Sequence, residues 1–137
     1  MIAESGLELL RSARYGRPLT GADFDGLDLS TAVVTGAWLK RCSFVGSDLR
    51  QSTLDNCHLT LCDLRTVNLR GSSLRHASFA GCDLHDADLR DCDLTGARLS
   101  YMNTGQANGL TDVTGAHFAG ATLRNVTFER VIGYQNA

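Results

Sequence analysis

The five cysteines are the side chains best suited to bind a metal or to undergo redox chemistry. Cys42, Cys62 and Cys82 are 20 residues apart, and Cys57 and Cys92 also differ from them by multiples of five. The sequence contains no CxxC pair of the kind that zinc sites use. Thiols spaced by multiples of five instead indicate a structural repeat, in which Cys interchanges with Ala and Ser as a compact core residue. We therefore predict no metal site and no cofactor.

Other residues with catalytic potential lack the context that catalysis requires. The four histidines, at positions 58, 76, 85 and 117, fall on seats predicted to face solvent, and no two have the spacing of a metal or catalytic motif. No serine lies in a nucleophile elbow, and no glycine-rich loop follows a strand and opens a helix. We predict that the protein is not an enzyme and that its histidines are ordinary surface residues.

A five-residue period runs through most of the chain. From Leu19 to Leu99, every fifth residue is Leu, Phe or Val, which gives 17 consecutive apolar centres. The residue two places before each centre is Ala, Ser or Cys in 14 of 17 repeats, and the last place is often Gly. This period matches neither an α-helix nor a plain strand, so it indicates a chain that turns a corner every five residues. The centre and the small residue would point inward, and stacked coils would share one core.

The pattern resembles the pentapeptide-repeat family, whose motif is A(D/N)LXX. Segments 22–26 (Ala-Asp-Phe-Asp-Gly) and 87–91 (Ala-Asp-Leu-Arg-Asp) match it, and the resemblance covers Pro18 to about Arg130. It implies an all-β fold, a right-handed quadrilateral parallel β-helix with 20 residues per turn and about five coils in this sequence. The core residues predicted from the repeat include Phe24, Leu39, Phe44, Leu64, Leu84, Cys42, Cys62 and Cys82.

We predict a single domain over residues 1–137, with both ends of the solenoid in need of cover. Its segments are a cap at 1–16, regular repeats at 17–103, a loop at 104–110, last repeats at 111–130 and a tail at 131–137. Residues 2–14 are expected to form a short helix that covers the first coil, with these apolar residues available: Ile2, Leu7, Leu9 and Leu10. At the other end, either the tail folds over the last coil or a second molecule covers it, which would make a homodimer.

The repeat loses its phase after Leu99, because Thr104 falls on a centre seat. The repeats then resume with their phase shifted by one residue, with centres at Val113, Phe118, Leu123 and Phe128. We interpret 104–110 as a loop that leaves the coil wall. It either carries function, with Gln106 and Asn108 as candidate contacts, or is an inert excursion.

One side of the expected solenoid combines basic and aromatic residues. Trp38 occupies a seat that usually holds Asp or Asn, and Lys40 and Arg41 follow it. An exposed Trp beside two cations is typical of an interaction anchor. In the alternative, the amino-terminal helix packs over Val33 and Trp38. The candidate interaction residues of this side are Trp38, Lys40, Arg41, His58, Arg98 and Tyr101.

Acidic residues gather in the repeats between 82 and 96. We name this group the acidic corner, and its members are Asp83, Asp86, Asp88, Asp91 and Asp93. The acidic corner could imitate DNA phosphates or attract a basic partner, and the alternative is a solvated polar wall. Like charges stacked one coil apart repel, so we expect Asp48 and Asp88 to pair with a column of arginines. That column consists of Arg50, Arg70 and Arg90.

Charge and hydropathy restrict the function further. With 13 basic and 15 acidic residues the net charge is −2, which disfavours direct binding to nucleic acid. No apolar run approaches the ~18 residues of a membrane span, and residues 1–10 show no secretion signal, so we expect no membrane partner and a cytoplasmic location. We predict a non-catalytic scaffold or regulatory protein that docks another protein through its flat sides. The alternative is a DNA mimic that protects or inhibits a type II topoisomerase, DNA gyrase, as in one branch of the family.

Overall fold

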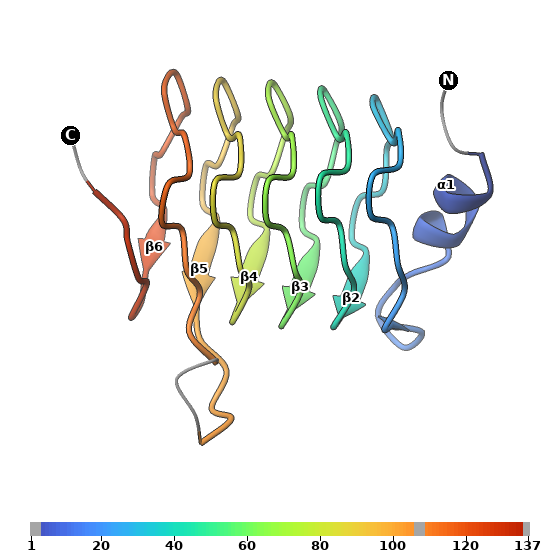
Figure 1. Ribbon diagram of the computed structural model, residues 1–137, viewed down its shortest axis with the longest axis horizontal. Helices are drawn as coiled ribbons and strands as arrows, with labels where there is room; N and C mark the ends of the chain where they lie inside the picture. Colours follow the sequence, from blue (N-terminus) through green and yellow to red (C-terminus); the bar gives the residue numbers. More distant parts are fainter. Residues whose placement is uncertain (1–3, 106–108, 136–137) are drawn as a thin grey trace.

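Six short parallel strands, one after another along the rod, form the sheet that organises the molecule (Figure 1). The computed structural model describes residues 4–105 and 109–135. The strands are β1 (Leu19–Thr20), β2 (Trp38–Lys40), β3 (His58–Thr60), β4 (Ser78–Ala80), β5 (Arg98–Ser100) and β6 (Thr127–Phe128). Leu39 pairs with Leu19 on one flank and with Leu59 on the other, so each of these coils advances the chain by 20 residues.

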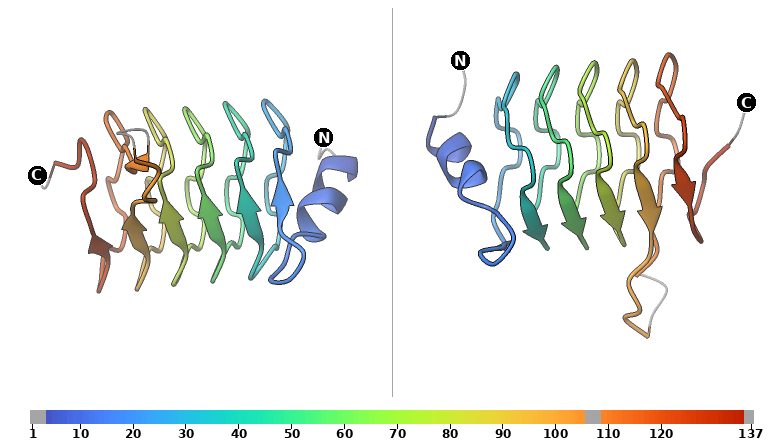
Figure 2. Two further views of the ribbon diagram at one scale, coloured as in Figure 1. Left: turned by 90° about the horizontal axis from the view of Figure 1, so that it is seen from below. Right: turned by 180° about the vertical axis from the view of Figure 1, so that it is seen from behind.

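Single parallel bridges, rather than strands, hold the other three sides of each coil. The first coil has one bridge on each of these sides: Asp23–Ser43, Asp28–Asp48 and Val33–Thr53. Four paired sides in 20 residues make a square solenoid, and the rod keeps this form along its length in both views of Figure 2. The predicted parallel β-helix with a short amino-terminal helix is therefore confirmed.

The corners between the sides depend on a left-handed backbone at the last residue of each repeat. Glycine adopts this conformation without steric cost, as Gly46 does with a φ of 66°. Other residues also occupy such corners, among them Leu61 with a φ of 53°, at a cost of about 1 kcal/mol. Beyond the Gly46 corner, the amide of Ser47 donates to the carbonyl of Phe44 over 3.1 Å and closes the turn. The recurring glycines of the sequence pattern therefore mark corners.

Two residues of each repeat fill the interior, as the pattern predicts. Phe24 and Phe44 are 0% and 1% exposed, and their rings stack with centroids 4.8 Å apart. Other buried residues of the expected core are Leu39, Leu64, Leu84, Cys42, Cys62 and Cys82. The thiol of each cysteine and the hydroxyl of Ser72, all at the small inward position of a repeat, donate to the carbonyl of the centre residue 23 positions earlier. Ser72 Oγ, for example, lies 2.7 Å from the carbonyl oxygen of Leu49.

An insertion separates β5 from β6. Leu99 pairs with Phe128, which lies 29 residues later instead of 20, so the chain gains nine residues here (29 − 20 = 9). An antiparallel bridge between Tyr101 and Leu110 closes the excursion, so the chain leaves the wall earlier than the predicted 104–110 segment. In Figure 1 the loop projects sideways from the rod, below β5 and beyond the edge of the other coils.

After the insertion, the chain returns to the columns that it left. Asp112 bridges Asp83, and Thr111 takes the small seat above Cys82. The hydroxyl of Thr111 accepts a hydrogen bond from the Cys82 amide at 3.1 Å and donates to the Phe79 carbonyl at 3.3 Å. Thr111 thus makes the contact that Cys82 makes one coil earlier, where its thiol donates to the carbonyl of Leu59.

The amino-terminal end of the core is covered by α1 (Glu4–Arg11), which ends three residues before the predicted limit at residue 14. Leu7 and Leu10 are 6% and 0% exposed and belong to the same apolar cluster as the coils. Leu9 was expected to contribute to this cover, but it is 44% exposed, because it lies on the outer face of the helix. The remaining residue of that expectation, Ile2, lies outside the described residues.

The carboxyl-terminal end is covered less completely. The apolar centres of the last coil, Phe118, Leu123 and Phe128, are only partly buried. Tyr134 from the tail stacks on Phe128 with centroids 4.0 Å apart and meets Phe118 edge-on at 5.8 Å. The tail therefore covers part of the last coil and leaves the rest open.

Candidate interaction surface

The side of the rod that carries β1 to β6, which we call the strand side, presents a row of aromatic rings. Trp38 of β2 stacks on His58 of β3, with centroids 4.1 Å apart and an interplanar angle of 25°. Tyr15 also packs edge-on against Trp38, with ring centroids 5.1 Å apart. Strand pairing sets the stack, because Trp38 and His58 are register partners with outward side chains. We call these three residues the aromatic row.

Partial cover distinguishes Trp38 from a fully exposed anchor. Trp38 is half-buried, while Tyr15 is 79% exposed and Val33 is 58% exposed. The contact with Trp38 therefore comes from Tyr15, in the segment after α1, and Val33 stays open to solvent. The expected alternative, a helix lying over both Val33 and Trp38, is wrong in this respect.

The cations of the strand side fall into two groups. Lys40 and Arg41 are exposed and form no ion pair among residues 4–105 and 109–135. Arg98 of β5 forms an ion pair with Glu129, with Nη2 and Oε2 3.0 Å apart. The guanidinium of Arg130 lies over the ring of Tyr101, with its Cζ 4.6 Å from the ring centroid. The structure thus brings Trp38, Lys40, Arg41 and His58 together, and it places Arg98 and Tyr101 farther along the rod with partners of their own.

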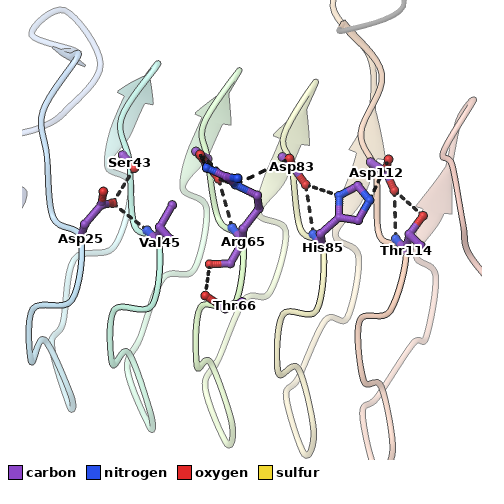
Figure 3. A network of polar contacts seen from close by, with 10 residues as sticks. Asp25, Ser43, Val45, Arg65, Thr66, Asp83, His85, Asp112 and Thr114 are labelled. Atoms are coloured by element: carbon purple, nitrogen blue, oxygen red, sulfur yellow. Dashed lines mark hydrogen bonds and ion pairs between the residues drawn. The ribbon is translucent and has the colours of Figure 1, made fainter.

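A chain of polar contacts joins the coils on the next side of the square (Figure 3). His85 Nδ1 lies 2.6 Å from Asp83 Oδ1, and His85 Nε2 lies 3.5 Å from Asp112 Oδ2. The hydrogen bond to Asp83 raises the pKa of His85, and both carboxylates favour its charged form. On the same side, the Arg65 guanidinium lowers the pKa of Asp63. The contact between His85 and Asp112 ties the coil before the insertion to the coil after it.

His85 lies on the surface, as predicted, with 41% of its side chain exposed, but its contacts with two carboxylates were not predicted. The pairing with Asp83 had a local signal, since the two residues are two positions apart in one repeat. The contact with Asp112 had no local signal, because it depends on how many residues the insertion adds before the columns resume.

The acidic corner spreads over three sides of one coil and is largely neutralised. Asp83, Asp88 and Asp93 lie on successive sides, as their separate bridges to Asp112, His117 and Thr122 show. Four of the acids have an arginine partner: Asp83 with Arg65 at 4.0 Å, Asp88 with Arg90 at 2.7 Å, Asp91 with Arg70 at 3.3 Å and Asp93 with Arg75 at 3.8 Å. Asp86 and Asp91 lie against the corner glycines of the next coil, Gly115 and Gly120. The five acids therefore do not form one patch of unpaired charge.

Pairing between the arginine column and the acids follows the expectation at two positions. Arg50 binds Asp48 at 2.7 Å, and Arg90 binds Asp88 at the same distance. Arg70 has Asn68 in place of an acid in its own repeat, and it reaches Asp91 in the next coil. These pairs are exposed, so each contributes less than about 1 kcal/mol to stability.

The thiols are held in a form unsuited to metal binding. All five cysteines are buried, and burial raises the pKa of the Cys57 and Cys92 thiols to about 11. Thiolates, rather than thiols, bind metals and react as nucleophiles. Across 4–105 and 109–135, no three His, Cys, Asp or Glu side chains are grouped so that they could hold a metal ion. In the same ranges, no helix has the length and apolarity to cross a membrane. The candidate loop contacts Gln106 and Asn108 lie outside the described residues.

A square parallel solenoid whose sides are five-residue units defines the class of this protein. A family profile described as "Pentapeptide repeat region" matches residues 32–108, which is more than half of the chain. The chain therefore belongs to the pentapeptide-repeat family, as the sequence predicted.

Among solved structures, the pentapeptide-repeat protein Rfr23 from the cyanobacterium Cyanothece 51142 has a TM-score of 0.68 and 20% identity, covering 96% of this chain and 97% of that one. A pentapeptide-repeat protein from the thylakoid lumen of Arabidopsis thaliana is 26% identical, with a TM-score of 0.34, covering 88% and 74%. Trypsin-treated QnrB1, a plasmid-mediated fluoroquinolone resistance protein, is 14% identical, with a TM-score of 0.39, covering 86% and 72%. No curated protein sequence matches this chain significantly.

Proposed function

We propose that this protein is a non-catalytic binding protein that docks another protein on its strand side. The observation that supports this most is the aromatic row beside Lys40 and Arg41, two exposed cations without an ion-pair partner in the described part of the chain. Aromatic residues and arginine dominate the binding energy of protein interfaces. The tightly filled core and the regular wall supply a rigid support for such a surface.

Partner capture with matched variants tests this proposal. Trp38→Ala should lower the recovery of a specific partner by tenfold or more, since a central interface Trp contributes about 2 kcal/mol or more. Val33→Ala is the control, because Val33 is an exposed apolar residue on a neighbouring side. Equal recovery of every partner by the wild type, Trp38→Ala and Val33→Ala would reject the strand side as the docking surface.

The alternative from the sequence, a DNA mimic that acts on DNA gyrase, depends on the acidic corner. A mimic of duplex DNA needs dense negative charge, whereas four of the five acids have an arginine partner and the whole chain carries only −2. A gyrase supercoiling assay with and without a fluoroquinolone decides between the two functions. We expect no effect of the added protein, and protection or inhibition at micromolar protein would favour the mimic.

We further propose that two copies associate through the carboxyl-terminal end. This proposal is supported by the half-buried centres of the last coil and by an open hollow of about 800 Å³ beside them, whose lining includes Phe118, Leu123 and Tyr134. Light scattering at rising protein concentration should show a shift toward twice the monomer mass. Phe118→Asp should prevent the shift, and a monomeric wild type at high concentration would contradict the proposal.

A further inference from the structure

Resting on the proposed function, we propose that the strand side binds an acidic segment of a partner protein whose aromatic side chain stacks above Ser78. The outward residues of four consecutive strands follow one line along the rod in the order Trp38, His58, Ser78 and Arg98, since each is the register partner of the next. The line thus has two rings, one small residue and one guanidinium. The small residue interrupts a stack that is otherwise continuous.

Spacing along this line matches the thickness of a ring. Neighbouring strands lie ~4.8 Å apart, so His58 and Arg98 are separated by about 9.6 Å across Ser78. The rings of Trp38 and His58, one strand apart, stack at 4.1 Å. A guest ring above Ser78 would therefore lie at stacking distance from the second face of His58 and beside Arg98 on the next strand.

The surroundings leave this position open. On the side of Ser78 toward the end of β4 the neighbours are small, because Ala80 follows on its own strand and Thr60 lies beside Ala80 on β3. Arg98 bonds to Glu129, next to β6, which draws its guanidinium away from β4. Its side chain is nevertheless 62% exposed and free to contact a guest on its other face.

Charge selects an acidic partner. Lys40 and Arg41 lie beside the aromatic row, are exposed and have no ion-pair partner within the described ranges. Among the described residues of the strands and their corners, the one carboxylate is Glu129, which Arg98 already neutralises. A guest ring with carboxylates on either side would place its charges toward these cations. Single-stranded nucleic acid would need a longer track of cations, and the chain carries a net charge of −2.

Two capped peptides serve as probes, Asp-Glu-Phe-Glu-Asp and the same peptide with Ala in place of Phe. Trp38 is the one tryptophan of the chain, so its fluorescence reports binding at the aromatic row. We expect the Phe peptide to change this fluorescence saturably and to shift the backbone amide signals of His58, Ser78 and Arg98. The Ala peptide should bind about tenfold more weakly, because it lacks the stacked ring.

Substitutions at the position separate the guest from the surface. Ser78→Phe fills the line with a ring of the protein itself and should weaken the Phe peptide about tenfold, whereas Ser78→Ala should leave its affinity unchanged. Arg98→Ala, which adds no bulk, should also weaken it. Circular dichroism checks that each variant folds. If Ser78→Phe does not fold, the effect of Arg98→Ala on the affinity for the Phe peptide tests the position of the guest ring.

Three results would overturn this inference: equal binding of the two peptides, no effect of either Ser78→Phe or Arg98→Ala, or tighter binding of oligothymidylate than of the Phe peptide. If a captured partner is lost with Trp38→Ala but retained with Ser78→Phe, the aromatic guest above Ser78 is rejected and the proposed function still stands. If the partner is retained with Trp38→Ala, the proposed function itself is rejected.

Discussion

Phe79 and Phe128 occupy the same column of the solenoid, but the coils around them differ. Phe79 has a coil on each side and is 2% exposed, while Phe128, in the last coil, is only half-buried. Both are centres of their repeats, so the repeat motif does not by itself determine burial. In a solenoid each coil is buried by its neighbours, and stability is a sum over adjacent coils.

The largest effect should come from deleting the two rings. Phe79→Ala should destabilise the protein by about 3–5 kcal/mol through lost burial and a cavity. Phe128→Ala should cost roughly 1–2 kcal/mol, because its ring loses less contact with surrounding apolar atoms. Urea unfolding at low protein concentration measures both. If the two substitutions cost equal stability at high protein concentration and unequal stability after dilution, a second copy of the protein covers the last coil.

A smaller contrast is expected at the opposite end, where the rod has a cap. Leu10 is fully buried under α1 and Leu9 is 44% exposed. Leu10→Ala should therefore cost about 2–4 kcal/mol, and Leu9→Ala less than about 0.5 kcal/mol. Thermal unfolding of the pair would show whether α1 caps the core or merely lies near it. Similar costs for the two variants would contradict the observed orientation of the helix.

Thr111 joins the first coil after the insertion to the coil before it. Thr111→Val keeps the shape of the side chain but leaves the Cys82 amide and the Phe79 carbonyl without this partner in a buried place. A loss of about 1–3 kcal/mol is expected, and Thr111→Ser should retain most of the stability because it keeps the hydroxyl. Hydrogen exchange of the Cys82 amide would localise the effect. Unchanged protection in Thr111→Val would show that the hydroxyl is not needed.

The smallest effect concerns His85, which joins the coils on either side of the insertion. Its pKa is raised in the folded protein, so its contribution is fully present below its unfolded pKa of about 6.5 and is lost as the pH rises through the higher folded value. The wild type should exceed His85→Gln in stability by a few tenths of a kcal/mol at pH 5.5 and by nothing at pH 8.5. A difference that does not change with pH would rule out the charged bridge.

The regular part of this fold could be predicted because its signal is local and repeated. Each inward seat can be recognised within five residues, and the small seats held by Cys42, Cys62 and Cys82 follow from the same count. The size of the insertion could not be predicted, since only the pairing of Leu99 with Phe128 shows that nine residues are added. The contact of His85 with Asp112 was missed because it depends on that number.

The candidate surface was less predictable than the fold. Trp38, Lys40, Arg41 and His58 do lie together, since they are separated by one coil or less. Tyr15 was missed, because it belongs to a segment outside the repeats whose path no periodic pattern describes. The pairing of Arg70 with Asp91 also crosses between coils, and it replaces a partner that Asn68 cannot supply.

The backbone hydrogen bonds between coils, such as that from Leu49 N to Asn68 O at 2.7 Å, run along the rod and not around it. A force that pulls the two ends of the rod apart therefore loads these bonds in series, and the coils should peel away one at a time. Each ordinary coil would release 20 residues, or roughly 70 Å of extended chain. The coil that contains the insertion would release 29 residues, or about 100 Å. Stretched as a single molecule, the protein would thus lengthen in nearly equal steps with one longer step.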